Sequence, residues 1–114
     1  MLDEASYGQV YLAAGCTDLR KSIDGLAVLV KERFQLDPFS NCLFVFCNRN
    51  RDKLKILHWE HNGFWLYYRR LERGKFESPA HAEAMTAISR RELRWLLDGL
   101  QIHAHREVSA RTVL

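Results

Sequence analysis

Hydrophobic residues in the middle of the chain form three runs separated by turn-forming residues. The first run, Cys42 to Cys47, is continuous and rich in aromatic and β-branched residues, and Asn48 to Asp52 interrupts it. The second run, Leu54 to Trp59, leads into Asn62-Gly63, and the third run, Phe64 to Leu71, follows. Asn-Gly is typical of a type I′ hairpin turn, because both central residues of that turn need φ > 0. The pattern predicts an antiparallel meander of three strands.

A two-residue Asn62-Gly63 turn pairs Trp59 with Leu66 and Leu57 with Tyr68, and cross-strand partners share a face. One face of the hairpin then carries Leu57, Trp59, Phe64, Leu66 and Tyr68. The other face carries Leu54, Ile56, His58 and Glu60 beside Trp65, Tyr67 and Arg69. The first face is predicted to pack against helices. The second is too apolar for plain solvent exposure, which indicates another covering element, a dimer partner or a ligand.

Two elements are predicted before the meander. Val10 to Ala14 reads as a short strand at one edge of the meander. Apolar residues from Leu19 to Phe34 recur at helical spacing, with charged residues on the other faces. Thr17 and Asp18 are candidate residues for its N-terminus, with a later start at Ser22 as the alternative. Asp37-Pro38 ends this helix, because the residue before proline is pushed out of the helical region.

A second helix is predicted after Ser89, which stands three residues before Glu92 as in a capping box. Its apolar stripe consists of Leu93, Leu96, Leu97 and Leu100. Together these elements predict an α+β fold with a mainly antiparallel sheet of about four strands, in the order β-α-β-β-β-α, with the helices packed on one face. Residues 1–114 are expected to form a single domain, with residues 1–8 and 104–114 loose.

Composition favours a soluble protein of the cytoplasm. The chain has 114 residues, a net charge of +3 and three cysteines, Cys16, Cys42 and Cys47, without a CxxC pair. An odd set of cysteines is typical of free thiols in a reducing compartment. No segment has the length of a signal peptide or approaches the ~20 apolar residues of a membrane helix. His58 and His61 lack metal-ligand spacing relative to the cysteines, so no metal site and no cofactor are predicted.

Basic residues are the strongest functional signal. The segment from residue 49 to residue 75 contains eight basic and only three acidic residues. The basic residues are Arg49, Arg51, Lys53, Lys55, Arg69, Arg70, Arg73 and Lys75. Such a stretch can neutralise nucleic-acid phosphates, while Trp65 and Tyr67 can stack on bases. The alternative is that charged rims keep an antiparallel sheet soluble and blunt its edges.

Catalytic chemistry is not predicted. The carboxylates are scattered over turns and caps rather than paired, and the chain has no glycine-rich phosphate loop.

Three stretches resemble a known family. They are VYLAAGCTDLRKSIDGLAVLV from Val10 to Val30, DPFS from Asp37 to Ser40, and the segment from Leu43 to Phe76. The most specific parts are Thr17 to Lys21 with Asp24-Gly25, and Tyr68 to Gly74. The chain resembles the TnpB accessory proteins encoded by the second open reading frame of insertion sequences of the IS-sixty-six group. This resemblance implies assistance in transposition, with a transposase or DNA as partner. It supplies no agreed active-site residues.

Two hypotheses follow. In the first, a non-enzymatic accessory protein of transposition contacts DNA through the eight basic residues at the rims of the meander. In the second, a protein-interaction module docks on the transposase or on a second copy through a sheet face that carries Ile56, Trp65 and Tyr67. A third reading, a small RNA-processing domain, rests on size and charge alone. Thr17, Asp18 and Arg20 either serve function or only cap and position the first helix.

Overall fold

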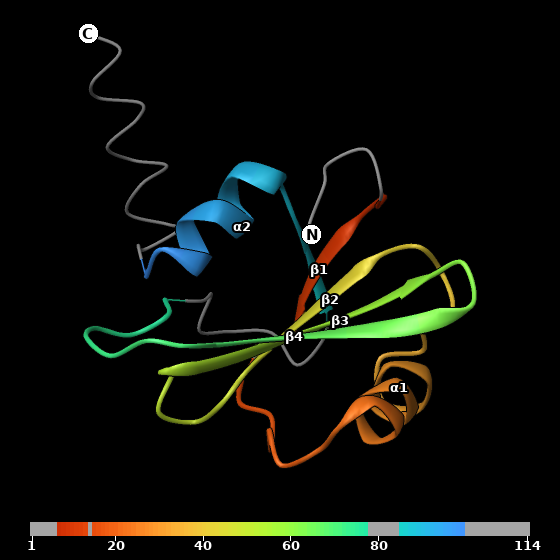
Figure 1. Cartoon of the computed structure of the whole chain (residues 1–114), viewed down its shortest axis with the longest axis horizontal. Helices are drawn as coiled ribbons and strands as arrows, with labels where there is room; N and C mark the ends of the chain where they lie inside the picture. Colours follow the sequence, from red (N-terminus) through yellow and green to blue (C-terminus); the bar gives the residue numbers. More distant parts are fainter. Residues whose placement is uncertain (1–6, 14, 78–84, 100–114) are drawn as a thin grey trace, which may run out of the picture.

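The computed structural model describes residues 7–13, 15–77 and 85–99. In this part of the chain five strands form one sheet in the order β4-β3-β2-β1-β5, and two helices pack on it (Figure 1). The strands are β1 (Val10–Ala13), β2 (Leu43–Cys47), β3 (Lys53–Glu60), β4 (Gly63–Arg70) and β5 (Met85–Ile88). The helices are α1 (Ile23–Glu32) and α2 (Arg90–Leu97). The predicted α+β class is confirmed.

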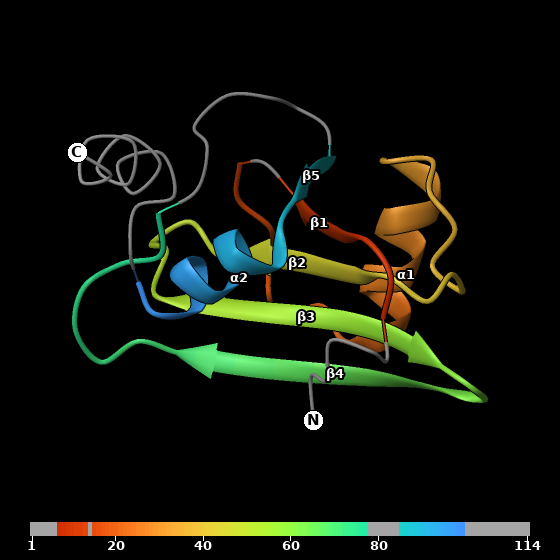
Figure 2. The ribbon, with the colours of Figure 1, turned by 90° about the horizontal axis from the view of Figure 1, so that it is seen from above.

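The antiparallel meander β2-β3-β4 is confirmed, and it forms one side of the sheet with β4 at the edge. β1 joins one edge of the meander, as predicted; the structure shows that this is the β2 edge and that the pair is parallel. A parallel pair needs a crossover between its strands, and here the crossover contains α1. β5, which was not predicted, pairs antiparallel with β1 and forms the far edge of the sheet (Figure 2).

The β3–β4 turn lies one residue earlier than predicted. Its two central residues are His61 and Asn62, with His61 at φ = 58°, and the pairs across the hairpin are Trp59–Phe64 and Leu57–Leu66. Moving the turn by one residue shifts the pairing by one residue in each strand. Because side chains alternate with a period of two, the predicted faces are unchanged.

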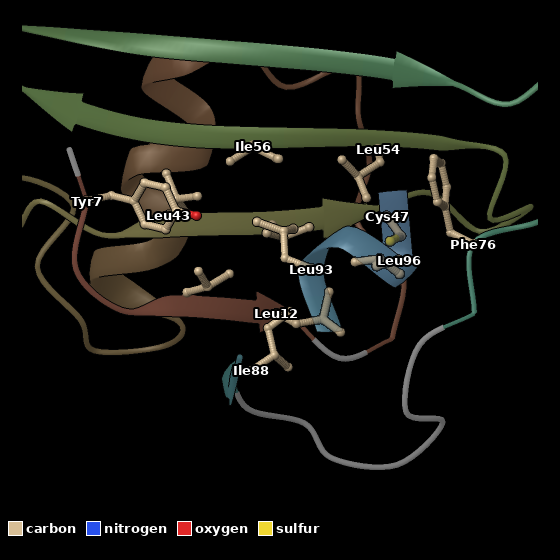
Figure 3. Close-up of a cluster of buried hydrophobic side chains, with 12 residues drawn as sticks. Tyr7, Leu12, Leu43, Cys47, Leu54, Ile56, Phe76, Ile88, Leu93 and Leu96 are labelled. Atoms are coloured by element: carbon tan, nitrogen blue, oxygen red, sulfur yellow. The ribbon is translucent and has the colours of Figure 1, made fainter. Parts of the chain in front are cut away.

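The two helices cover opposite faces of the sheet (Figure 1). Leu26 and Val30 of α1 pack in one buried cluster with Phe44, Phe46 and Leu57. On the other face α2 contributes Leu93 and Leu96 to a cluster with Leu43, Val45, Leu54 and Ile56 (Figure 3). The prediction that both helices pack on one face is therefore wrong. All five residues of β2 are buried, and a strand with successive apolar residues needs cover on both sides.

α1 begins at the later of the two predicted starts, after Ser22. Asp18 does not cap it. Its carboxylate instead accepts a hydrogen bond from the Arg20 backbone N–H at 3.0 Å, within a turn before the helix. The helix ends where Gln35 adopts φ = 55°, a left-handed conformation that is common after helix C-termini, and the Leu36 N–H donates to the Val30 carbonyl at 3.0 Å.

The capping box of α2 is confirmed. The Ser89 hydroxyl accepts from the Glu92 N–H at 3.0 Å, and the Glu92 carboxylate accepts from the Ser89 N–H at 2.9 Å. Leu93 and Leu96 of the predicted stripe are buried, while Leu100 lies outside the described residues.

The described fold begins at Tyr7. Its side chain is buried, and the Gly8 N–H donates to the Asn41 carbonyl at 2.7 Å. These two residues therefore belong to the fold, although residues 1–8 were expected to be loose. Residues 1–6 and 104–114 lie outside the described part. Within the described ranges, no helix is long and apolar enough to cross a membrane.

Candidate nucleic-acid interface

One end of the sheet collects the predicted basic residues. β2 ends, β3 begins and β4 ends there, because neighbouring strands of a meander run in alternate directions. The turn between β2 and β3 carries Arg49 and Arg51, the adjoining strand ends carry Lys53, Lys55, Arg69 and Arg70, and the segment after β4 carries Arg73 and Lys75. We call these eight residues the basic end; it lies at the left of Figure 1.

Asn48 shapes the turn between β2 and β3. Its side-chain oxygen accepts hydrogen bonds from the backbone N–H groups of Asp52 (3.1 Å) and Lys53 (3.0 Å). Its side-chain amide donates to the Asp52 carboxylate at 2.7 Å. This donated bond holds the pKa of the Asp52 carboxyl below its usual value. The turn is therefore fixed by its own side chains and projects Arg49, which is exposed.

The segment after β4 is fastened to the same turn. The Leu71 N–H donates to the Asp52 carbonyl at 2.8 Å, and the Phe76 N–H donates to the Arg51 carbonyl at 2.6 Å. Phe76 is fully buried in the cluster under α2. Arg73 lies in the exposed loop between these two attachment points, which brings it to the basic end.

Three members of the basic end also stabilise the fold. The Lys55 ammonium donates to the carbonyls of Leu19 (2.7 Å) and Lys21 (3.0 Å), which ties the turn before α1 to the sheet. The Arg69 Nε donates to the Leu97 carbonyl at 2.8 Å, at the C-terminus of α2. Arg70 forms an exposed ion pair with Glu72 at 2.8 Å, which also raises the pKa of the Arg70 guanidinium. These side chains are partly committed to the protein itself.

The outer loops carry the most available charge. Arg49, Arg73 and Lys75 are exposed, and within the described part of the chain no hydrogen bond or ion pair engages their side chains. A partner that carries phosphates can reach these three residues without breaking a side-chain hydrogen bond or ion pair of the described residues.

Arg20 and Lys21 also lie at this end, and the sequence reasoning did not include them in the basic group. They follow β1, whose C-terminus lies beside that of β2 because the two strands are parallel. The Thr17 N–H donates to the Cys47 carbonyl at 2.8 Å and fixes this turn beside the sheet. The signal that could have found them is the predicted strand of residues 10–14, which is followed after a short turn by Arg20 and Lys21.

A shallow groove of about 590 Å³ runs between this turn and the sheet. Its walls include Arg20, Lys53 and Tyr68, and Tyr68 is exposed. Asp18 also lines the groove and forms an exposed ion pair with Arg20 at 2.8 Å. The hydrogen bond from Arg20 lowers the pKa of the Asp18 carboxyl to about 2, so Asp18 keeps its negative charge and partly neutralises Arg20.

The predicted partner face is only partly exposed. Trp65 is 54% exposed, and its ring stacks on that of Tyr67 with centroids 6.2 Å apart. The Trp65 indole N–H donates to the Glu60 carboxylate at 3.3 Å. Tyr67 packs partly against the cluster under α2, and burial raises the pKa of its hydroxyl. Ile56 is 1% exposed beneath that cluster, so its place in the predicted partner interface is wrong.

Residues 8–107 match the family described as IS66 Orf2 like protein. The chain belongs to this family. One relative, Uncharacterized protein y4hO of Sinorhizobium fredii, is 36% identical over 100 residues, which cover 88% of this chain and 87% of the relative. A second, Uncharacterized protein y4jC of the same organism, is 30% identical over 92 residues, covering 81% of this chain and 79% of the relative. No solved structure matches the chain.

Membership of the IS66 Orf2-like family confirms the resemblance seen in the sequence and associates the chain with transposition, in an accessory role. The matched range contains β1 to β5, α1, α2 and the whole basic end.

The three cysteines of this IS66 Orf2-like protein are free and differ in burial. Cys16 is exposed, Cys42 is half-buried and Cys47 is buried. Burial raises the pKa of the Cys47 thiol to about 11, so this thiol stays protonated within the core. Among the described residues, no group of three His, Cys, Asp or Glu side chains could hold a metal ion.

Proposed function

We propose that this IS66 Orf2-like protein assists transposition in the bacterial cytoplasm by contacting DNA through its basic end, without catalysing a reaction itself. The observation that carries the proposal is the convergence of eight basic residues, from both sides of the β3–β4 hairpin, on one end of the sheet. Clustered Lys and Arg residues neutralise phosphates and release bound counterions, which supplies most sequence-independent affinity for DNA.

The contact is proposed to run along the phosphate backbone rather than into the grooves. The apolar stripes of α1 and α2 pack on the sheet, and the available charges sit on loops. Loop arginines and lysines fix a protein on a duplex but carry no base specificity by themselves. Sequence recognition would then come from a partner, such as the transposase of the element.

Replacing Arg49, Arg73 and Lys75 together by alanine is expected to weaken DNA binding strongly. If each side chain contacts one phosphate, the slope of log K against log salt should become less negative by about 3, since each duplex phosphate contributes about −0.9. The measurement is a titration of labelled duplex and single-stranded DNA with purified protein at several salt concentrations.

A matched control removes the same charge elsewhere. Lys31, Arg33 and Arg91 are also exposed and basic, but they lie outside the basic end. Their triple alanine variant should lower affinity only through net charge and keep most of the salt slope. Equal losses in the two triple variants would show that net charge, not the basic end, causes binding. Absence of binding by the wild type at low salt would refute the proposal.

A second candidate function is docking of a partner protein on the aromatic face, which is favoured by the exposed Trp65 ring stacked on Tyr67. Large exposed aromatic side chains are enriched at protein interfaces. Trp65→Glu should then abolish capture of the purified transposase or of a second copy, whereas Val28→Glu, at a 52% exposed position on α1, should not. Unchanged capture by Trp65→Glu would exclude this face.

A further inference from the structure

The β4 edge of the sheet is long and regular. β4 has eight residues and pairs with β3 over all of them, while its other side has no neighbouring strand in the described part of the chain. Figure 2 shows β4 at one edge of the sheet and β5 at the other. β5 has only four residues. An edge strand presents unpaired backbone N–H and C=O groups, which can pair with another strand.

The outward-facing backbone groups of β4 follow from the hairpin geometry. In a two-residue hairpin the residues flanking the turn, here Glu60 and Gly63, form a hydrogen-bonded pair, and such pairs then alternate along the strands. The Leu71 N–H continues this alternation by donating to the Asp52 carbonyl at 2.8 Å. The residues whose N–H and C=O groups point away from β3 are therefore Phe64, Leu66, Tyr68 and Arg70.

The usual protections of an edge strand are weak along β4. Natural edges are blunted by short length, proline, bulges or charged residues. The first six residues of β4, Gly63 to Tyr68, contain no charge and no proline, and the eight-residue register with β3 contains no bulge. Trp65 and Tyr68 in this stretch are 54% and 55% exposed. Such an edge favours pairing over remaining in water.

We propose that two copies of this chain pair through β4, antiparallel, to form one continuous sheet across the dimer. A two-fold axis perpendicular to the sheet keeps the α1 faces of both copies on the same side, so paired residues must share a face. Only a register centred on Tyr67 then pairs all four outward-facing residues with one another. Leu66 pairs with Tyr68 of the second copy and Phe64 with Arg70, which gives about eight backbone hydrogen bonds.

Side chains in this register are complementary. On the α2 face Trp65 lies opposite Arg69 of the second copy, and Glu60 already accepts a hydrogen bond from Trp65. The Arg69 guanidinium has five N–H donors, and within the described part of the chain only the Nε donor is used, at the Leu97 carbonyl of its own chain. Arg69 of the second copy can therefore lie over the Trp65 indole ring and approach the Glu60 carboxylate. This charge complementarity favours a second copy as the occupant of the edge. The dimer does not depend on DNA contact.

The first test measures mass and amide exchange of the full chain. Light scattering after size exclusion should give twice the 13.4 kDa of one chain at high concentration. In NMR hydrogen exchange, the amides of Phe64, Leu66, Tyr68 and Arg70 should be protected in concentrated protein and lose protection on dilution. The amides of Trp65, Tyr67 and Arg69 bond to β3 and should stay protected at both concentrations. A mass of one chain at every concentration would overturn the proposal.

Tyr68→Pro tests the edge itself. Proline removes an outward-facing N–H without touching the β3 ladder, and proline is tolerated on edge strands. The dimer dissociation constant should rise by about 100-fold or more, because the bond is lost twice and the ring blocks the approach of the second strand. Tyr68→Val keeps the N–H and should keep most of the affinity. Equal effects of the two substitutions would overturn the proposal, and if Tyr68→Pro fails to fold, the exchange pattern of the wild type decides.

Trp65→Glu separates edge pairing from docking on the aromatic face. In the edge dimer a carboxylate at position 65 would face Arg69 of the second copy, so the dimer should persist. Loss of the dimer in this variant, with the monomer still folded, would place the interface on the face and overturn the edge register.

Discussion

Phe76→Ala is expected to lower the free energy of unfolding by about 3–5 kcal/mol, as is usual for a large aromatic side chain removed from a core. Phe76 is fully buried although it lies on a loop, and it belongs to the cluster formed with Leu54 and Leu96 (Figure 3). The free energy of unfolding of a small domain is only about 5–15 kcal/mol in total, so this variant should be close to unfolding. Urea denaturation followed by tryptophan fluorescence and circular dichroism measures the change.

Two substitutions control for this effect. Phe76→Leu keeps most of the apolar volume and should cost under about 1.5 kcal/mol. Phe39→Ala removes the same side chain from a position that is 56% exposed, so it should cost much less than Phe76→Ala. A loss below about 1 kcal/mol for Phe76→Ala would mean that this side chain does not hold the loop to the core.

The importance of Phe76 could not be read from the sequence, because it depends on which elements meet at the basic end. By contrast, the two faces of the β3–β4 hairpin were predicted correctly from the assumed turn and the alternation of side chains. The turn chemistry was misassigned, since Asn-Gly suggested a type I′ turn one residue later than the observed His61-Asn62 turn. The predicted faces are nevertheless correct, because the earlier turn changes the partner of each β3 residue by two positions, and residues two apart in a strand share a face.

The sheet beyond the meander was harder to predict. β5 has four residues and the sequence MTAI, and its partner β1 lies more than 70 positions away in the chain. Local patterns carry little information about such pairings, which depend on tertiary contacts. The placement of the helices on opposite faces was missed for a different reason. β2 is apolar at every position, and that pattern already indicates a strand buried on both sides.

The basic end was partly visible in the sequence, because its members lie within residues 49–75 and antiparallel hairpins bring such segments together. Which of them are available to a partner was not visible. Lys55 and Arg69 donate to backbone carbonyls of the turn before α1 and of the end of α2. The hairpin pattern alone assigned Ile56 to an open face, whereas in the structure α2 covers that part of the face and Ile56 is buried.

Stability is expected to fall as the pH drops below about 6.5, and His58 is the cause. Its side chain is 2% exposed, its Nε2 lies 2.7 Å from the Asn41 side-chain oxygen, and its Nδ1 is buried without a partner in the described part of the chain. Burial lowers the pKa of His58 from the usual 6.5, and the nearby Glu60 carboxylate opposes this shift. The unfolded chain therefore binds more protons than the folded one between the lowered pKa and 6.5. Within that window stability should decline by up to about 1.4 kcal/mol per pH unit.

Denaturation curves between pH 8 and pH 5, for the wild type and for His58→Leu, measure this contribution. The substitution removes the titrating group and puts an apolar side chain of similar size against Tyr7. Asn41 loses its hydrogen-bond partner His58, but it is exposed and can bond to water instead. In this variant the free energy of unfolding should decline much less below pH 6.5 than in the wild type. Asp18 and Asp52 do not interfere, because their lowered pKa values place their own loss of stability below about pH 4. Parallel curves for the two proteins would show that the His58 ring is charged equally well in the folded and unfolded chain, and hence that burial does not control it.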